Sequence, residues 1–292
     1  MGVERGRIRA ISHSSGAGTW ELVLCRPTPQ LAPYVRDYHG YRERTATPVR
    51  RIEVTTPAAV VIVNFGPAWR LGDGRAPERM ATHGSFVAGL YSTYAVSENT
   101  GASHCLQFNL TPLGARRILG LPLHHLANRI VDLADVLGKE ALELEERIAD
   151  TIGWPARFAL LDEFLEARIA AAAQVSPVVL AAWQRLERSG GMVPVSGLAR
   201  DLDISRKHLS VGFREAFGLP PRTVARLLRF RRVIDGLAAE QAPRWSELAV
   251  DCGYYDQAHL IRDFHQFAGM SPRAFMRSRL PDGSGVIDDL GL

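Results

Sequence analysis

Cysteine and long hydrophobic runs are scarce in this chain of 292 residues, and each scarcity excludes a class of protein. Cys25, Cys105 and Cys252 are widely spaced and form no C-x-x-C pair, so they indicate neither a disulfide framework nor a zinc finger. The longest apolar run, 58–63, is too short to cross a membrane, and the charged N-terminus lacks the apolar stretch of a signal peptide. We therefore expect a soluble, cytoplasmic protein that has no membrane partner.

The chain also lacks the usual sequence patterns of enzymes. Neither a G-x-S-x-G elbow, nor a Walker A loop, nor a G-x-G-x-x-G turn in its proper context is present. His39, His83 and His104 lie in strand-rich sequence, but they do not form an H-x-H pattern with a downstream Glu and His, and no carboxylate cluster accompanies His124 and His125. We expect no enzymatic activity, no metal and no cofactor.

Positive charge is present but unevenly distributed. The whole chain carries a formal net charge of +4, whereas residues 177–280 contain 16 Lys and Arg against 10 Asp and Glu, a net charge of +6 (16 − 10). The cations are almost all arginine, since Lys139 and Lys207 are the only lysines. Basic charge collected in one third of a chain is typical of a domain that faces nucleic-acid phosphates.

The first part of the chain changes its hydrophobic period near residue 110. From about 20 to 110, short β-branched and aromatic stretches are separated by Gly, Pro and Asn, which predicts an antiparallel barrel or sandwich. Apolar residues then recur every three or four positions, which predicts helices. These expected helices cover 112–119, 123–129, 139–149 and 155–170.

Three segments follow from these patterns. The small, weakly polar stretch 170–176 marks a boundary between a first domain at 1–170 and a second at 177–280. Everything from 177 to 278 reads as helical, whereas the Gly- and Asp-rich tail at 281–292 is expected to be disordered. The fold class is therefore α+β, with a β-rich domain followed by an all-α domain.

The second domain contains a duplicated apolar pattern. Leu198-Ala199-x-Asp201 recurs as Leu248-Ala249-x-Asp251 at an offset of 50 (248 − 198), whereas Leu209 and Leu260 are offset by 51 (260 − 209). One extra residue has therefore entered the second copy between Tyr254 and Leu260, where a turn accommodates it. Each copy reads as a helix-turn-helix unit, a module that lays its second helix into a DNA groove, so the chain is expected to read two successive major grooves.

The first unit consists of a supporting helix at 195–202, a turn at Asp203 and Ile204, and a second helix from the N-cap Ser205 to about Phe217. Leu209, Phe213 and Phe217 recur at i, i+4 and i+8, so they predict the buried face. The opposite face is expected to contact DNA, with base reading by its N-terminal part. The candidate DNA-binding residues are Arg206, Lys207, Ser210, Val211 and Arg214.

The second unit repeats this arrangement. Ser246 is expected to cap a helix at 247–252, and Asp256 to cap the second helix to about Phe267, with Leu260, Phe264 and Phe267 facing inward. The candidate DNA-binding residues are Gln257, Ala258, His259, Ile261 and Arg262. Between the units, 221–237 reads as one helix about 24 Å long that separates the two reading helices. We expect at least half of its arginines, Arg226, Arg229, Arg231 and Arg232, to be structural.

The stretch from Val193 to Arg279 resembles the tandem helix-turn-helix domain of the AraC/XylS transcription regulators. The second unit carries most of the family pattern, as Ser246-Glu247-Leu248-Ala249, Gly253-Tyr254-x-Asp256, Arg262-x-Phe264 and Gly269-Met270-Ser271-Pro272-x-x-Phe275. The first unit departs from it, with Gly212 in mid-helix and Asp203 where glycine is usual in the turn. Gly212 is expected to cost about 0.5–1 kcal/mol relative to alanine.

The first domain resembles the sensor half of some family members, a cupin-like small barrel followed by helices. The likeness rests on Leu31-Ala32-Pro33-Tyr34-Val35, the valine-rich strand at 60–63, and Thr111-Pro112-Leu113-Gly114-Ala115. It implies effector binding in the barrel, dimerisation through it, or both. The partners implied are double-stranded DNA and, beyond it, a small-molecule effector, a second copy of the chain and RNA polymerase.

Two rival functions stay open at this point. One is an architectural protein that bends DNA without sequence preference, against which stands the modest net charge. The other is a cupin-like metalloenzyme fused to a DNA-binding domain, which the scattered histidines do not favour.

Overall fold

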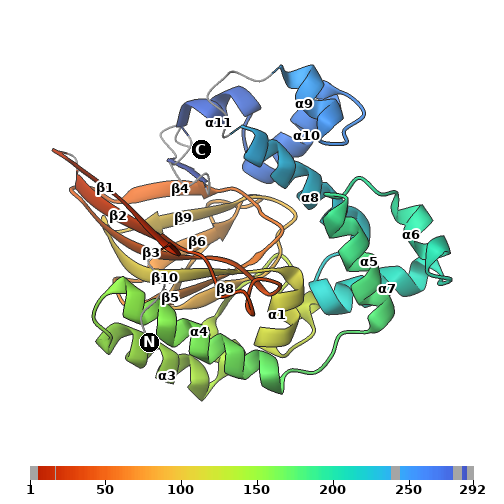
Figure 1. Ribbon diagram of the computed structural model, residues 1–292. Helices are drawn as coiled ribbons and strands as arrows, with labels where there is room; N and C mark the ends of the chain where they lie inside the picture. The colour runs from red at the N-terminus through yellow and green to blue at the C-terminus, as the bar shows by residue number, and fades with distance from the viewer. Residues whose placement is uncertain (1–5, 17, 238–243, 279–284, 288–292) are drawn as a thin grey trace.

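The computed structural model describes residues 6–16, 18–237, 244–278 and 285–287. The chain begins with two β-sheets and their covering helices, here called the N-terminal domain (6–171), and continues with seven helices at 177–278, here called the helical domain (Figure 1). Within the described ranges no helix combines the length and the apolar character that spanning a bilayer requires.

The strands of the N-terminal domain divide into two antiparallel sheets. The seven-stranded sheet has the order β1 (Ile8–Ser15), β2 (Gly18–Cys25), β3 (Val35–Thr45), β10 (Ala102–Leu110), β5 (Ala59–Asn64), β8 (Phe86–Ala88) and β11 (Ile130–Asp132). The five-stranded sheet has the order β12 (Gly285–Ile287), β4 (Val49–Glu53), β9 (Ala95–Asn99), β6 (Trp69–Asp73) and β7 (Met80–His83).

The α+β class is confirmed, but the expected barrel does not close. Among the described residues, no hydrogen-bonded ladder joins the two sheets. The two sheets instead contribute side chains to one cavity, whose lining also includes Arg231, Ile234 and Ser278 of the helical domain.

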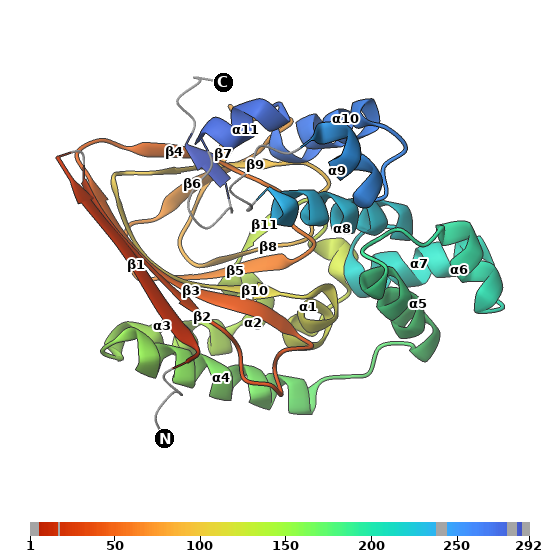
Figure 2. The same ribbon diagram turned by 45° about the horizontal axis from the view of Figure 1, so that its top comes forward.

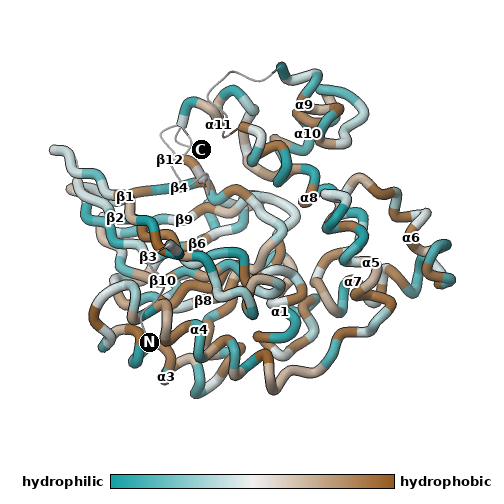
Figure 3. The backbone as a smooth tube through the Cα atoms, in the orientation of Figure 1, coloured by the Kyte–Doolittle hydropathy of each residue, from teal (hydrophilic) through white to brown (hydrophobic). Residues whose placement is uncertain are grey.

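Helices α1 (Pro112–Leu119), α2 (Leu133–Leu137), α3 (Lys139–Asp150) and α4 (Trp154–Ala171) belong to the N-terminal domain, and α3 and α4 cover the outer face of the seven-stranded sheet (Figure 1). Phe158 of α4 stacks on Tyr38 of β3, with ring centroids 5.9 Å apart. Gly40 of β3 permits this approach, since a Cβ there would lie 2.4 Å from the ring of Trp154. Hydrophobic segments accordingly concentrate where helices and sheet meet, whereas the outer end of the β1–β2 hairpin is hydrophilic (Figure 3).

The helix expected at 123–129 is only a single 3-10 turn, η1 (Leu123–His125). Asn128 adopts a left-handed backbone with φ +54°, which ends any helical continuation there. The chain then enters β11, a short strand that the helical period of the sequence concealed.

The helical domain contains α5 (Pro177–Arg188), α6 (Val195–Asp201), α7 (Arg206–Phe217), α8 (Pro221–Gly236), α9 (Trp245–Asp251), α10 (Gln257–Ala268) and α11 (Pro272–Ser278). Two aromatic clusters hold it together. Trp183 and Phe213 both pack on Phe217, whereas Phe264 and Phe267 pack on Phe230, with ring centroids 5.0–5.2 Å apart. Helix α8, which carries Phe230, packs against both α7 and α10 (Figure 2).

The tail differs from the expected disorder at residues 285–287, which form β12 and pair with β4 of the N-terminal domain. Val286 is 1% exposed and belongs to the hydrophobic core. The sequence conceals this strand because a three-residue strand carries no periodic signal of its own. Residues 281–284 and 288–292 lie outside the described part of the chain.

Candidate nucleic-acid interface

The first helix-turn-helix unit folds as its sequence predicted. Ser205 caps α7, because its hydroxyl accepts a hydrogen bond from the backbone N–H of His208 at 3.0 Å. The turn before it places Asp203 in the left-handed region with φ +50°, a conformation that aspartate tolerates better than most residues. Leu209, Phe213 and Phe217 are buried, which confirms the predicted inner face of α7.

The outward face of α7 carries the candidate reading residues of this unit. Arg206, Lys207, Val211 and Arg214 are exposed, and Ser210 is half-buried. Val211 is 53% exposed on this face. A methyl-bearing side chain flanked by cations suits the major groove, where thymine methyls and guanine O6/N7 atoms are the targets.

The second unit confirms the α10 cap but corrects the start of α9. Asp256 Oδ1 accepts a hydrogen bond from the backbone N–H of His259 at 2.7 Å, so α10 begins where predicted. Ser246 is not an N-cap, because α9 begins one residue earlier, at Trp245, and its N-cap position is Arg244. Arg244 binds Glu247 at 3.0 Å instead.

The outward face of α10 presents the second set of candidates. Gln257, Ala258 and Arg262 are exposed, whereas His259 and Ile261 are half-buried. The His259 ring packs edge-on against Tyr254 with centroids 5.1 Å apart, so this histidine has a packing role as well as a surface position. Leu260, Phe264 and Phe267 are buried, as their spacing predicted.

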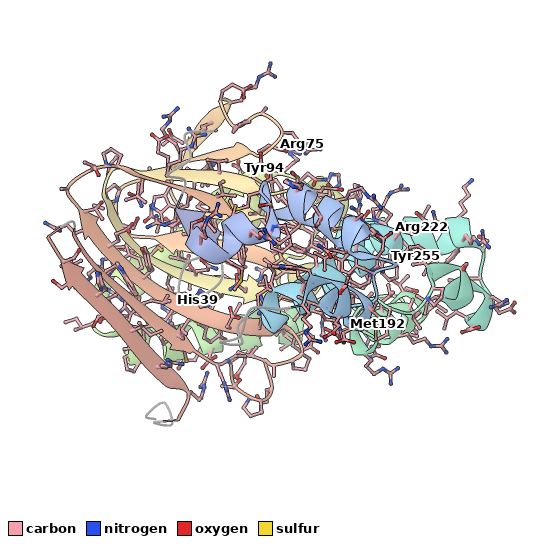
Figure 4. All side chains as sticks on the ribbon, turned by 90° about the horizontal axis from the view of Figure 1, so that it is seen from above. His39, Arg75, Tyr94, Met192, Arg222 and Tyr255 are labelled. Carbon is pink, nitrogen blue, oxygen red and sulfur yellow. The ribbon has the colours of Figure 1, made fainter. Side chains whose placement is uncertain are left out.

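The positions of the helix N-caps and of the turn hydrogen bonds show that Tyr255 is the extra residue of the second unit. The backbone N–H of Ile204 donates to Ala199, and that of Tyr254 donates to Ala249, so these two positions correspond at an offset of 50 (254 − 204). The caps Ser205 and Asp256 correspond at 51 (256 − 205), which leaves Tyr255 without a counterpart. Its side chain is 90% exposed immediately before α10, at the end of the molecule that also carries Met192 and Arg222 (Figure 4). Sequence reasoning did not single out Tyr255 as a surface residue, although the change of offset pointed to its turn.

Arg226, Arg229, Arg231 and Arg232 of α8 all have partners within the protein, in agreement with the expectation that at least half of these four are structural. Arg226 binds Asp263 with two nitrogens and lies over the Phe267 ring, 4.9 Å from its centroid. Arg229 donates to the backbone oxygen of Gly191 at 2.8 Å, and Arg232 donates to that of Asp251 at 3.0 Å. Arg231 pairs with Asp235 at 2.7 Å. Helix α8 is therefore fastened to both units.

A cavity of about 510 Å³ lies between the two sheets of the N-terminal domain. Its apolar lining comprises Trp20, Leu22, Val54, Val60, Ile62, Trp69, Leu71, Phe86, Ala88 and Ile130, and its charged lining includes Arg36, Asp37, Glu43, Arg51 and Glu53. Arg51 contacts Glu43 at 2.5 Å, so this pair is self-satisfied. The size and mixed lining are typical of small-molecule sites.

Charged side chains from both domains line the cavity. Burial lowers the pKa of Arg36, and the positive charge of Arg231 on α8 lowers it further. Burial opposes ionisation of Asp37, but bonds from His39 and Asn109 and the charge of Arg36 outweigh it and bring its pKa to about 2. The lining therefore includes Arg36 and Arg231, one from each domain, and the Asp37 carboxylate, which stays ionised.

The three histidines considered in the sequence each have their own partners. His39 faces Asp37 at 3.3 Å, and His83 faces Asp132 at 2.6 Å. His104 accepts from Arg42 and Arg157 at 3.3 and 3.2 Å. Over the part of the chain that the structure describes, no group of three His, Cys, Asp or Glu side chains is arranged to hold a metal ion.

Comparison with protein-family models matches two parts of the chain. Residues 198–278 match the model of a helix-turn-helix domain, and residues 24–132 match a domain of unknown function, DUF6597. Comparison of the sequence with curated proteins gives no match.

Solved structures with a similar arrangement include ToxT from Vibrio cholerae, with 10% identity over 82% of this chain and 98% of that chain and a TM-score of 0.49. A form of ToxT bound to an unsaturated fatty acid matches with 10% identity over 83% and 95% of the two chains and a TM-score of 0.48. The C-terminal domain of AraT from Geobacillus stearothermophilus matches with 22% identity over 37% and 90%, and a TM-score of 0.34. With the helix-turn-helix model over 198–278, the family pattern in the second unit and two capped reading helices, this part of the chain is a helix-turn-helix domain of the AraC type.

Proposed function

We propose that the protein binds a specific DNA site by placing α7 and α10 in two successive major grooves on one face of the duplex. The observation that carries this proposal is that the N-terminal half of each helix is exposed, whereas its opposite face is buried. Arg206 and Lys207 on α7 are suited to guanine, and Gln257 on α10 is suited to adenine. Such a regulator acts without enzymatic chemistry, in the cytoplasm where bacterial DNA is located.

Selection of bound sites from a random DNA pool tests this function. The full chain should enrich one site with two boxes about one helical turn apart and keep it against on the order of 10³-fold excess of random competitor. Equal binding to competitor and selected DNA would instead support an architectural protein and overturn sequence-specific reading.

The face assignment is tested on that selected site with single substitutions. Changing Arg206, Lys207, Gln257 or Arg262 to Ala should cost about 1–3 kcal/mol of binding free energy where the residue reads a base, and should relax preference at one position. Arg147→Ala is the matched control, because it removes an exposed arginine from α3 of the N-terminal domain. Unchanged DNA affinity in all four variants would show that the faces are wrongly assigned.

We also propose that the cavity of the N-terminal domain binds a small effector. Its lining is largely apolar and includes Arg36 and Arg231, so it favours an apolar molecule with one acidic group. An unsaturated fatty acid, the ligand named for one solved form of ToxT, serves as the first probe. The probe should raise the Tm of the wild type and raise that of Arg36→Gln much less, whereas no shift for a range of acids would argue against this ligand class.

Dimerisation through the N-terminal domain and contact with RNA polymerase belong to the same proposal as separate steps. Light scattering of the full chain, with and without the selected DNA, distinguishes a monomer that reads two grooves from a dimer that reads two sites. Transcription from a promoter that carries the selected site, with purified polymerase, measures the second step.

A further inference from the structure

Both reading helices contact the N-terminal domain at the same position, the glycine that ends each helix. Gly218 follows α7 with φ +83°, and a Cβ there would lie 2.9 Å from the backbone oxygen of Leu123. Gly269 follows α10 with φ +70°, and a Cβ there would lie 2.9 Å from the ring of Tyr94. The two glycines are 51 residues apart (269 − 218), the offset of the repeat. Each helix is therefore held at its C-terminal end and exposed at its reading end.

The contact with α10 includes the last backbone carbonyls of that helix, which have no partner within it. The hydroxyl of Thr93 donates to the oxygen of Gln266 at 3.1 Å, and the backbone N–H of Thr55 donates to that of Phe267 at 3.0 Å. The Gln266 side chain donates in return to the backbone oxygen of Ser92 at 2.9 Å. The N-terminal domain thus completes the C-terminal cap of α10.

The segments that hold the two helices, 90–94 and 123–128, are bonded to each other, and we call them together the bracket. Asn128 joins them. Its Oδ1 accepts from the backbone N–H of Ser92 at 2.7 Å and from the Ser92 hydroxyl at 2.8 Å, and its own N–H donates to Leu90 at 3.0 Å. The left-handed backbone of Asn128 turns the chain so that side chain and backbone reach the same loop.

The bracket is continuous with the walls of the cavity. Strand β8 runs into its first segment and β11 follows its second, and both strands contribute side chains to the cavity lining. Thr55 also lines the cavity, and its hydroxyl donates to the backbone oxygen of Tyr91 at 2.8 Å. A molecule in the cavity would therefore touch the same strands that end in the bracket.

We propose that Asn128 is a positioning residue for DNA reading. By joining the two segments, it holds the ends of α7 and α10 at one mutual spacing, so that the full chain selects DNA by the distance between its two boxes. The inference rests on the proposed function. Helix α8 connects the units along the chain, and the bracket fixes them a second time at their far ends, which limits rotation about α8.

Two substitutions of Asn128 distinguish the role of its side chain from the role of its left-handed backbone. Asn128→Gly keeps the left-handed conformation at no steric cost but removes the acceptor for both Ser92 bonds. Asn128→Asp keeps an acceptor oxygen in the same place and tolerates the same backbone, so it is the matched control.

The test uses the DNA site selected by the wild type, with the spacer between its boxes lengthened or shortened by about 1–2 base pairs. Wild type and Asn128→Asp should lose about tenfold in affinity when the spacer changes, a difference of about 1.4 kcal/mol. Asn128→Gly should bind the original site about tenfold more weakly and differ by less than about threefold among spacers. A DNA with one box should be bound equally by all three proteins, because each unit is intact.

A second measurement needs no DNA. Spin labels at Glu215→Cys on α7 and Val250→Cys on α9, both exposed positions, report the distance between the units. Asn128→Gly should broaden the distance distribution, and Asn128→Asp should not. The inference would be overturned if Asn128→Gly showed the same preference for spacer length as the wild type and the same distribution of label distances. A wild type that selects no DNA site would overturn the proposed function instead, and the label distances would still decide whether Asn128 positions the units.

Discussion

At the scale of single residues, Gly212 reverses an expectation based on helix propensity. In mid-helix a glycine should cost about 0.5–1 kcal/mol relative to alanine. The structure explains why glycine is nevertheless favourable here: a Cβ at Gly212 would lie 2.6 Å from Cγ2 of Val179 on α5. Val179 is 2% exposed and β-branched, so it has little freedom to move aside. Glycine is what lets α5 approach α7.

We therefore expect Gly212→Ala to lower the free energy of unfolding by about 1 kcal/mol, since overpacking of a core costs about 1–3 kcal/mol and exceeds the propensity gain. Chemical denaturation measures the change. Adding Val179→Ala should make the same substitution at Gly212 neutral or stabilising. If Gly212→Ala without the second substitution were more stable than the wild type, the close contact between position 212 and Val179 would be contradicted.

At the same scale, His104 should make the stability of the folded protein depend on pH. Burial, then the charges of Arg42 and Arg157, lower its pKa from 6.5 to about 4. Because the folded state binds the proton more weakly than the unfolded state, protonation favours unfolding, and stability falls as the pH drops from about 6.5 towards 4. Wild type should lose more Tm between pH 7 and pH 4.5 than His104→Gln, which cannot be protonated there. Parallel acid profiles of the two proteins would exclude this histidine as the cause.

At the scale of elements, the pair Arg226 and Asp263 fixes α10 against α8. Asp263 is 2% exposed and its carboxylate binds Arg226 at 2.6 Å, so removal of the arginine leaves a buried charge without its partner. Arg226→Ala should therefore destabilise the protein by on the order of 3 kcal/mol. Arg222→Ala, at an exposed arginine in the first turn of the same helix, should change stability by less than about 0.5 kcal/mol. Equal melting curves for the two variants would mean that the ion pair does not anchor α10.

Some helices could be predicted from local sequence signals alone. The caps Ser205 and Asp256 and the apolar stripes of α7 and α10 act within one or two turns, so the sequence predicted these helices almost to the residue. The cap expected at Ser246 was wrong, since α9 begins at Trp245. Short strands such as β11 and β12 escaped prediction because their hydrogen bonds join residues far apart in the chain.

At the scale of the whole molecule, β12 returns the chain from the helical domain to the N-terminal domain. Val286 is buried in the core, which is worth about 1.5 kcal/mol, and the strand covers the edge of β4. Truncation after Ser278 should lower the Tm and promote aggregation through the uncovered edge. Truncation after Ile287 is the control and should change neither. Identical melting and light scattering of the two truncated chains would mean that β12 does not stabilise the fold.

The sequence by itself determined the tandem units, their buried stripes and the exposed candidates Arg206, Lys207, Gln257 and Arg262, because helix faces and caps depend on residues three or four positions apart. Only the tertiary structure decided that the sheets stay open around a cavity, that Arg226, Arg229 and Arg232 of α8 bind other segments of the protein, and that the bracket holds both reading helices. Those features are contacts between segments that lie far apart in the sequence. No local period encodes them, since each depends on how whole elements pack together.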